Sequence, residues 1–563
     1  MSNKIKKNTE NEFSEEQVKQ AAEQTANPET IFDEALVNLA SDPAALYTDE
    51  VISALKTIRS KDRLAYIRLC TKAKGHKTAL EKMTAPEQEE RDDNDSSRLI
   101  AIARESCTLG HDADGRGVAI INVNNINQVW YLDSIGFSDW LRSTYFNATS
   151  KGIADLAIKT AILTLTAIGN FNGKKYKLHL RCAEFENDYF IDLCNESWQV
   201  VRIGVNGWDI VNNSPVLFTR TKNMRPLPQL DCAGNIDNLW LFANVTDQQK
   251  VLILAWLIES FRPNTPFPVL ELCGEQGSAK STTQRCLRDL IDPNKVPLRG
   301  RPKTTEDIYV AANNSWMVSF ENLSYLTSEQ QDAFCTLSTG GGFATRQYYT
   351  NGDEFVMETK RPVMLNGINP IATQSDLIER AISIEAPNIP TDKRKDEQAL
   401  QAEWQMHYPS VFVGLLNLFS ASLKLLSQVK LAKKYRMADF QLLGEAVAQA
   451  QGHPPGYFTS IYGSSASEGI DRSLEVYGVS NAIQVFMADQ KDGVWEGTVL
   501  ALKWALEFLP GVEKSNWPKS PRGLSGQLKR LAPGLRQRGI QISHMGHGRL
   551  GSILHLSIIG TLE

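Results

Sequence analysis

The sequence lacks the cysteine pairs and the long apolar runs that are typical of secreted and membrane proteins. Its eight cysteines include no CxxC pair and no His/Cys spacing of a zinc site, so we expect reduced thiols rather than a disulfide framework. The longest apolar runs, such as VLILAWLI at 251–258, are too short to span a bilayer. The N-terminal stretch MSNKIKKNTENEFSEEQ has no apolar signal-peptide core. We therefore expect a cytoplasmic protein with no membrane partner.

The chain also lacks an overall excess of basic charge. Its 65 acidic residues outnumber 60 basic ones and give a net charge of −5, which counts mildly against a nucleic-acid partner. The exception is residues 514–562, which contain no Asp or Glu. The basic residues of this stretch are Lys514, Lys519, Arg522, Lys529, Arg530, Arg536, Arg538 and Arg549. This local asymmetry indicates an anionic partner for the C-terminal part.

The order of patterns along the 563 residues predicts an α/β protein of several domains. We expect a disordered tail (1–27), a helical unit (28–83), a charged linker (84–97), an α+β domain (98–227), a three-layer α/β domain (228–395), a helical lid and connector (396–475) and a C-terminal domain (476–563). Within the connector, GHPPGYFTSIYGSSASEG at 452–469 is expected to be rich in loops.

The stretch LCGEQGSAKSTT at 272–283 is close to the phosphate-binding loop G-x-x-x-x-G-K-[ST]. An apolar strand precedes it and a helix follows, which is the context that the motif requires. The candidate nucleotide-binding residues are Gly274, Glu275, Gln276, Gly277, Ser278, Ala279, Lys280, Ser281 and Thr282. Lys280 would bind the β- and γ-phosphates of ATP, and Ser281 would bind Mg²⁺.

Ala279 departs from this motif, because glycine usually precedes the lysine. A methyl group costs little where φ is negative and is a real obstacle where φ is positive. We expect Ala279 to be tolerated as a residue at the start of the helix.

Two later strands end in polar residues that suit a nucleotide site. Glu321 follows WMVSF and is the candidate acid for Mg²⁺, while Asn322 occupies the place of a second acid. Asn322 could position a water molecule but could not take its proton. Asn366 ends VMLN and could orient the attacking water, although an Asn-Gly pair is also a common strand terminator. These residues predict an ATPase with a single acid, Glu321, at this strand end.

Arg380, in SDLIERA, is a candidate for the arginine that a neighbouring subunit supplies to a transferring phosphoryl group. The alternative is a surface salt bridge with Asp376 or Glu379. The order of Arg380 after the other motifs favours the catalytic interpretation.

Two segments are candidates for contact with DNA. FATRQYYT and EFVMETK flank the turn signal Asn351-Gly352, so we expect a hairpin whose Arg346, Tyr348 and Tyr349 grip a nucleic-acid strand in a pore. Residues 520–559 are expected to form a helix over 522–531, a second helix over 533–538 and a β-hairpin wing, as in a winged helix. An exposed hairpin, or a winged helix that binds protein, is the alternative.

These motifs resemble the replicative ATPases of phages and integrated mobile elements, which are similar to superfamily-3 helicases of the AAA+ class. The stretches that carry this resemblance are RPNTPFPVLELCGEQGSAKST, FENLS, TGGGFATRQYYT, RPVMLNGI and DLIERA. The resemblance implies a Walker A loop at 274–281, a Walker B acid at Glu321, sensor 1 at Asn366 and an arginine finger at Arg380. It also implies a hexameric ring that moves along DNA, single-stranded in the pore. The sequence shows no catalytic primase motif, so we expect any primase to be on another chain. Relatives more often have Asp where this chain has Glu321, whereas Ala before the lysine is usual among them.

The expected fold is thus a P-loop AAA+ core with N-terminal helical and α+β domains and a C-terminal winged helix. The leading hypothesis is an ATP-dependent DNA helicase or translocase that acts in the replication of a mobile element. A DNA-binding scaffold regulated by nucleotide is the first alternative. A defence or chaperone-type ATPase that acts on proteins is the second.

Overall fold

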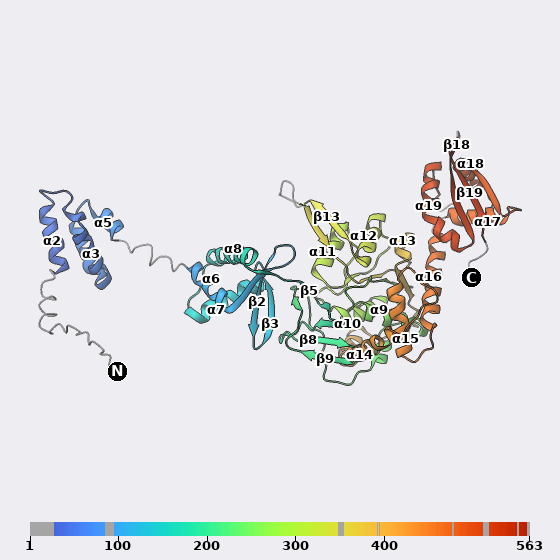
Figure 1. Ribbon diagram of the computed structural model, residues 1–563, viewed down its shortest axis with the longest axis horizontal. Helices are drawn as coiled ribbons and strands as arrows, with labels where there is room; N and C mark the ends of the chain where they lie inside the picture. The colour runs from blue at the N-terminus through green and yellow to red at the C-terminus, as the bar shows by residue number, and fades with distance from the viewer. Residues whose placement is uncertain are drawn as a thin grey trace, which may run out of the picture. The chain divides into compact units, whose positions relative to one another are not determined.

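The computed structural model describes residues 27–84, 95–346, 354–390, 392, 394–475, 478–510, 517–548 and 551–559. It shows a mixed α/β protein with several separate sheets (Figure 1), which confirms the predicted α/β multidomain class. All eight cysteines have free thiols, as expected. The chain divides into two compact units, residues 1–105 with 139–164, and residues 106–138 with 165–563.

The first unit contains a helical cluster with its own core. Phe32, Leu46 and Leu55 are fully buried there. The cluster and the helices that follow it are α2 (Pro28–Asn38), η1 (Ala45–Tyr47), α3 (Asp49–Lys61), α4 (Arg63–Lys72), α5 (Lys77–Met83), α6 (Asp95–Ser106), α7 (Ile135–Thr149) and α8 (Asp155–Asn172). Asp62 caps α4 by accepting hydrogen bonds from the backbone N–H groups of Leu64 and Ala65 at 2.9 and 3.0 Å.

The second unit begins with small sheets. One sheet has the order β3-β2-β1-β4, a second has the order β6-β7-β8-β9, and β10 pairs with β5 in parallel. The strands are β1 (Cys107–His111), β2 (Gly117–Val123), β3 (Ile126–Tyr131), β4 (Lys174–Lys175), β5 (Leu178–Leu180), β6 (Cys182–Phe185), β7 (Asp188–Asp192), β8 (Val200–Gly204), β9 (Gly207–Val211) and β10 (Leu217–Thr219). Ile191, Val201 and Ile203 from the second sheet belong to the same apolar core as the helices that follow. The predicted domain border at residue 227 therefore falls inside a shared core.

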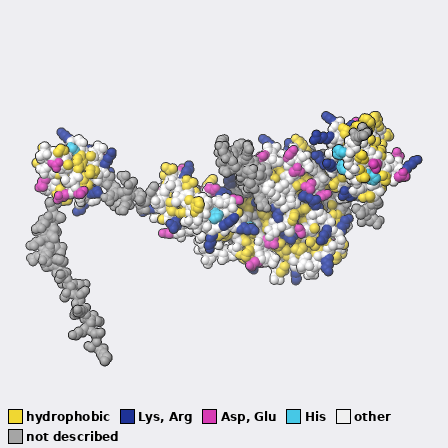
Figure 2. Space-filling model, turned by 45° about the horizontal axis from the view of Figure 1, so that its top comes forward, with side chains coloured by type: hydrophobic (Ala, Val, Ile, Leu, Met, Phe, Trp, Pro, Cys, Tyr) yellow, Lys and Arg dark blue, Asp and Glu magenta, His cyan; other side chains and the backbone are white. Residues whose placement is uncertain are grey.

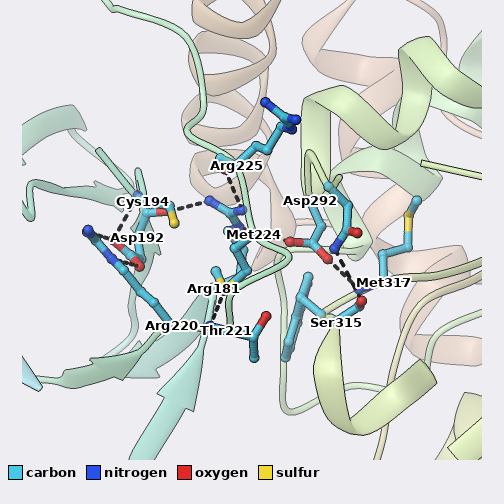
Figure 3. A network of polar contacts seen from close by, with 12 residues as sticks. Arg181, Asp192, Cys194, Arg220, Thr221, Met224, Arg225, Asp292, Ser315 and Met317 are labelled. Atoms are coloured by element: carbon cyan, nitrogen blue, oxygen red, sulfur yellow. Dashed lines mark hydrogen bonds and ion pairs between the residues drawn. The ribbon is translucent and has the colours of Figure 1, made fainter. Parts of the chain in front are cut away.

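A buried ion pair joins this second sheet region to the following domain (Figure 3). Arg181 and Asp292 are both fully buried, and Arg181 Nε donates to Asp292 Oδ1 at 3.1 Å. The other guanidinium nitrogens of Arg181 donate to the carbonyl oxygens of Asp192 and Arg225 at 3.0 and 2.9 Å. Asp292 Oδ2 accepts from the backbone N–H of Met317 at 3.2 Å. Every side of this ion pair is thus hydrogen-bonded, as a buried pair of charges requires.

The central domain contains a parallel sheet of four strands in the order β12-β15-β11-β16. Its elements are η3 (Ile236–Leu241), α9 (Asp247–Glu259), β11 (Val269–Cys273), α10 (Lys280–Ile291), α11 (Thr305–Asn314), β12 (Val318–Phe320), α12 (Ser328–Thr339), β13 (Gly342–Arg346), β14 (Glu354–Glu358), β15 (Val363–Asn366), α13 (Ser375–Ile378) and β16 (Ala381–Glu385). Strands β11 and β15 are buried at every position, which is typical of a parallel sheet covered on both faces. The predicted mainly parallel sheet is confirmed.

Helices follow the central sheet, and one of them was not expected. They are α14 (Glu397–Leu426), α15 (Ala438–Ala450) and α16 (Tyr457–Glu475). The segment predicted to be rich in loops forms most of α16, so that prediction is wrong. Phe458 and Tyr462, four residues apart, are buried on one face and pack against Phe440. This burial outweighs the poor helix propensity of the intervening glycine and serines.

Helix α14 is, within the described ranges, the only helix long and apolar enough to cross a membrane by length and composition alone. Most of its apolar stretch is buried inside the protein. Val411, Leu415 and Phe419 belong to the main core, which is where a long apolar helix of a globular protein packs.

The C-terminal part has a separate apolar core and a sheet in the order β17-β19-β18. Its elements are α17 (Gly478–Ala488), β17 (Val494–Thr498), α18 (Val499–Glu507), α19 (Pro521–Gln537), β18 (Ile540–Gly548) and β19 (Gly551–Ile558). One continuous helix, α19, replaces the two helices expected at 522–531 and 533–538. Pro533 lies inside α19 without ending it. Leu528, Leu531 and Leu535 bury one face of the helix on both sides of the proline, so tertiary packing overrides the local break.

Candidate functional site

The loop between β11 and α10 contains two glycines with positive φ, and its backbone packs closely against a neighbouring segment of the chain. Gly274 and Gly277 have φ values of 143° and 84°, which only glycine adopts easily. A Cβ atom on Gly274 would lie 2.7 Å from the carbonyl oxygen of Ala386. The path of the chain therefore favours glycine at both positions.

Ala279 adopts the left-handed conformation, with φ 56° and ψ 26°. The expectation that Ala279 is tolerated because its φ is that of a helix start is wrong. The left-handed conformation costs a residue with a Cβ atom about 1–2 kcal/mol. The loop holds this conformation because α10 begins directly afterwards, and the N–H of Thr283 donates to the carbonyl of Ala279 at 2.9 Å.

Lys280 is the first residue of α10, and its side chain folds back over the loop. Its Nζ donates to the carbonyl oxygens of Gly274 and Glu275 at 2.8 and 2.7 Å, and lies 3.3 Å from Ser278 Oγ. Partial burial lowers the pKa of Lys280 below its ordinary value. The ammonium group thus lies at the N-terminus of a helix, where an anionic ligand would be most stable.

The remaining loop residues differ in exposure. Ser278 is buried and its Oγ donates to the carbonyl of Glu275 at 2.8 Å. Glu275 and Gln276 are exposed, and Ser281 and Thr282 are half-buried. The loop is therefore anchored by Ser278 and open to solvent on its outer side.

The structure brings the predicted strand-end residues together beside this loop. Asn366 Oδ1 accepts from the backbone N–H of Asn322 at 2.8 Å, and Asn366 Nδ2 lies 3.4 Å from Ser281 Oγ. Glu321 directly follows β12, and its backbone N–H donates to the carbonyl of Arg299 at 2.7 Å. Asn322 has a φ of 54°, a conformation that Asn adopts more readily than most residues. Because β11, β12 and β15 are parallel, Lys280, Ser281, Glu321, Asn322 and Asn366 share one edge of the sheet.

A buried glutamine that sequence analysis missed connects these groups. Gln284 lies one turn after Lys280 and is fully buried. Its Nε2 donates to Ser319 Oγ at 2.9 Å and to the carbonyl of Phe320 at 3.0 Å. Its Oε1 accepts a hydrogen bond from Asn366 Nδ2. The only sequence signal for this role is a polar residue on the apolar face of the helix.

Asn244, which sequence analysis also missed, fixes the loop from another side. Its Nδ2 donates to the carbonyl oxygens of Ser278 and Pro387 at 2.9 and 2.6 Å. Its backbone N–H donates to Thr283 Oγ1 at 3.0 Å. The loop is thus held between the segment before α9 and the segment after β16, which are far apart in sequence.

The donor set at this edge fits a magnesium ion better than a transition metal. The described residues include no group of three or more His, Cys, Asp or Glu side chains that could hold a metal. Mg²⁺ in phosphate-transferring sites usually takes one or two protein oxygens and completes its shell with water and phosphate. The Ser281 hydroxyl and the Glu321 carboxylate are oxygen donors of that kind.

Arg380 lies at the opposite edge of the sheet. It immediately precedes β16, whose first residue Ala381 pairs with Val269 at the start of β11. At about 3.3 Å per residue along β11, the backbone of Arg380 is roughly 16 Å from the loop of the same chain. Its guanidinium forms an ion pair with Asp376 and is 12% exposed. Arg436 also pairs with Asp376, at 3.3 Å, so the salt bridge that was the alternative for Arg380 is present.

The predicted hairpin is present as β13 and β14, with Gly342 paired to Glu358 and Arg346 paired to Glu354. It extends away from the central sheet (yellow in Figure 1). Arg346 ends β13, but its side chain, Tyr348 and Tyr349 lie outside the described residues. Their predicted contact with DNA stays a prediction.

The predicted DNA-binding residues between 519 and 538 are exposed, and Lys and Arg side chains lie on the visible face of the C-terminal part (dark blue in Figure 2). These residues are Lys519, Arg522, Lys529, Arg530, Arg536 and Arg538, while Arg549 lies outside the described residues. Arg522, Lys529 and Arg536 recur every seven residues along α19 and therefore share one face of the helix.

Two of these residues contact the rest of the second unit instead. Arg538 Nε donates to Asp471 Oδ1 of α16 at 2.7 Å. Arg530 lines a small cavity together with Ser375, Ile378 and Glu379 of the α13 segment. The six basic side chains described therefore fall into a solvent-facing group and a group directed at α13 and α16.

Two family models match the sequence. The one described as the replication protein (RepA) of actinomycete integrative conjugative elements matches residues 236–458. The one described as the C-terminal domain of this RepA matches residues 479–559. No curated protein matches the sequence.

Several solved structures resemble the chain distantly. An apo structure of the NrS-1 C-terminal region is 12% identical, covers 82% of this chain and 98% of its own, and has a TM-score of 0.36. A second apo structure of that region is 13% identical, with 83% and 100% covered and the same TM-score of 0.36. A JCV helicase bound to a small molecule is 12% identical, with 42% and 70% covered and a TM-score of 0.19. Such TM-scores carry no argument about fold or activity.

The family models, by contrast, match consecutive parts of one kind of protein and together span more than half of the residues. They confirm the predicted resemblance to replication proteins of integrated mobile elements. The chain belongs to the RepA replication-protein family of integrative conjugative elements.

Proposed function

We propose that this replication protein is an ATP-dependent DNA translocase or helicase. The observation that carries the proposal is the meeting of Lys280 and Ser281 with Glu321 and Asn366 at one edge of a parallel sheet. A glycine loop, a lysine at a helix start and a carboxylate on a neighbouring strand are what phosphoryl transfer from ATP needs. The central domain is then a P-loop ATPase of the AAA+ class.

Each residue has a role in this proposal. The backbone N–H groups of residues 277–280 and the ammonium group of Lys280 bind the phosphates. Ser281 and Glu321 hold Mg²⁺, which neutralises charge on the phosphates when it is bound. Asn366 orients the attacking water, and the position of Asn366 is fixed by Asn322 and Gln284. Thr282, Glu275 and Gln276 complete the loop.

The placement of Arg380 supports action across a subunit interface. Its backbone is too far from the loop of its own chain to serve it, while a ring brings this edge of one subunit to the nucleotide of the next. We therefore propose a homo-oligomeric ring, a hexamer, in which Arg380 leaves Asp376 and stabilises charge on the phosphoryl group of the neighbouring subunit.

DNA contact is assigned to two places. The β13–β14 hairpin, with Arg346, Tyr348 and Tyr349, would follow single-stranded DNA through the ring. The C-terminal part has the element order helix, strand, helix, helix and a two-stranded wing, which supports a winged-helix assignment. Its exposed basic residues on α19 would bind the DNA backbone. A primase would be a separate chain, and the protein would act in the cytoplasm.

The test is ATP hydrolysis measured with and without single-stranded DNA at low salt. We expect DNA to stimulate turnover in the wild type and Lys280→Ala to abolish turnover. Lys295→Ala, which changes an exposed lysine away from the loop, is the matched control and should retain full activity. Turnover that is unaffected by DNA would contradict a helicase or translocase.

One observation favours a second candidate, a DNA-binding scaffold regulated by nucleotide. Asn322 occupies the place of a second acid, and an amide cannot accept the proton of an attacking water. Nucleotide-dependent assembly on DNA without measurable turnover would establish the scaffold instead.

A further inference from the structure

The segment that follows β16 lines one side of the nucleotide loop. The backbone N–H of Ala386 donates to the carbonyl of Cys273 at 2.8 Å. Asn388 Nδ2 lies 3.4 Å from Glu275 Oε2. Asn244 joins Pro387 to Ser278, as described above. The side chain of Asn388 and the backbone of Ala386 and Pro387 are therefore placed beside the loop.

The guanidinium group of Arg394 lies against this loop. A Cβ atom on Gly277 would lie 2.8 Å from Arg394 Nη2 and 3.1 Å from its Cζ. The guanidinium group thus rests against the Cα side of Gly277, in space that a side chain at this position would fill. The positive φ of 84° favours glycine at 277, and the absence of a side chain there leaves room for the guanidinium of Arg394.

The charge of Arg394 is available to a ligand. Its Nε donates to the carbonyl of Ile389 at 3.3 Å. This hydrogen bond leaves the Nη1 and Nη2 groups on the side of Gly277. No carboxylate of the described residues forms an ion pair with Arg394, whereas the adjacent Lys395 pairs with Glu403 at 2.6 Å. Arg394 is also exposed. Two cations therefore lie against the loop. Lys280 comes from the start of α10, and Arg394 comes from the segment after β16.

We propose that Arg394 is a second phosphate-binding residue that acts on the nucleotide of its own chain and makes the site selective for nucleoside triphosphates. This inference rests on the proposed function. A planar guanidinium forms paired hydrogen bonds with phosphate oxygens. Its attraction grows with the charge of the ligand, so ATP gains more from Arg394 than ADP does. Arg394 thus complements Arg380, which would come from the neighbouring subunit.

The test is the dissociation constant of fluorescently labelled ATP and ADP for the full chain. We expect Arg394→Ala to weaken ATP binding by about tenfold or more, the effect of losing a charge-assisted hydrogen bond, and to weaken ADP binding less. Arg394→Lys should recover part of the ATP affinity. Lys395→Ala, which removes the same charge one residue away, should bind both nucleotides as the wild type does.

The outcomes separate the two proposals. Absence of nucleotide binding by the wild type would overturn the proposed function and this inference together. ATP binding by Arg394→Ala at wild-type affinity would overturn the role of Arg394 alone. Equal weakening by Arg394→Ala and Lys395→Ala would show a general charge effect and would also overturn it. Far-UV circular dichroism of each variant shows that it is folded.

Discussion

Gln284 accepts a hydrogen bond from the side-chain amide of Asn366, and this contact joins the helix that begins at Lys280 to the end of strand β15. The same glutamine donates to Ser319 Oγ and to the carbonyl of Phe320, at the end of β12. One side chain thus fixes the loop helix to both strands that end in candidate catalytic residues.

Replacing Gln284 should therefore affect turnover as well as stability. We expect Gln284→Ala to lower the free energy of unfolding by about 2 kcal/mol, because it leaves buried polar partners unpaired. ATP turnover should fall by about tenfold, because Asn366 loses its fixed orientation. The matched control is Gln441→Ala, which removes another fully buried glutamine with hydrogen bonds of 2.9 and 3.1 Å in α15. Urea denaturation measures the free energy of unfolding of both variants, and steady-state assays measure their ATP turnover. Equal slowing of turnover in both variants would contradict this role for Gln284.

The left-handed backbone at Ala279 predicts an unusual effect of glycine. Ala279→Gly should raise the free energy of unfolding by up to about 1 kcal/mol, since relief of the left-handed strain exceeds the entropy cost of glycine. Ala402→Gly, at an exposed position inside α14, should instead lower it by about 1 kcal/mol. Urea denaturation of the two variants should thus show opposite signs. A loss of stability in both would contradict the backbone conformation at Ala279.

Asp289 predicts a dependence of stability on pH. Burial raises the pKa of this carboxyl group to about 6, although Trp404 Nε1 donates to it at 3.0 Å. Because the folded protein holds the proton more tightly than the unfolded chain, the charged carboxylate destabilises the fold above pH 6, and this effect disappears as the pH falls through 6 toward 4. We expect Asp289→Asn to raise the free energy of unfolding by about 1–2 kcal/mol at pH 8, a discounted value for a partly exposed group. Urea denaturation should show a smaller gain in the free energy of unfolding at pH 5 than at pH 8.

The control for Asp289 is Asp247, an exposed carboxylate whose pKa is lowered by Lys250. A lowered pKa means that its charged form is favoured by folding. Asp247→Asn should therefore bring no gain at pH 8. A gain of the same size in both variants would contradict burial as the cause.

The two groups of basic residues on α19 predict different effects on DNA binding. Alanine in place of Arg522, Lys529 and Arg536 should weaken binding and reduce the slope of log K against log salt by about 0.9 for each phosphate that the protein no longer neutralises. Arg538→Ala should leave that slope unchanged, because Arg538 pairs with Asp471. Fluorescence anisotropy over a series of salt concentrations measures both. If the slope of log K against log salt falls equally in all variants, Arg538 contacts the DNA as well.

Arg380 predicts complementation between inactive variants. Lys280→Ala and Arg380→Ala should each hydrolyse ATP at a small fraction of the wild-type rate. In an equal mixture, about a quarter of the interfaces of a ring combine an intact lysine with an intact arginine from the neighbour, so part of the activity should return. If no activity returns in mixed assemblies, the role of Arg380 is limited to its ion pair with Asp376.

The local order of the central domain could be predicted from the sequence because it depends on short patterns. An apolar run, a glycine loop and a helix at 269–291 give β11 and α10, and the polar residues after two further apolar runs mark Glu321 and Asn366. Free thiols, the parallel sheet and the β13–β14 hairpin were predicted for the same reason. The family of the chain followed from these motifs as well.

The residues that sequence analysis missed act through contacts distant in sequence. Gln284 meets Asn366 across 82 positions, and Asn244 meets Pro387 across 143. A lone polar residue on a helix or in a loop gives no sign of such a partner. The helix over 457–475 was missed because its propensity is poor and its stability comes from buried aromatic side chains. Likewise the φ of Ala279 depends on the whole loop and cannot be read from the residue.

The buried pair of Arg181 and Asp292 determines where the chain can be cut. The family match begins at residue 236, and a fragment that began there would remove Arg181, the nearer cation of Asp292, and leave only Arg288 at 3.9 Å. Removing one partner of a buried ion pair costs about 3–5 kcal/mol, a large share of the stability of a domain. The shortest autonomous ATPase fragment should therefore begin before β5, so that the unit that folds is longer than the unit that is recognisable by sequence.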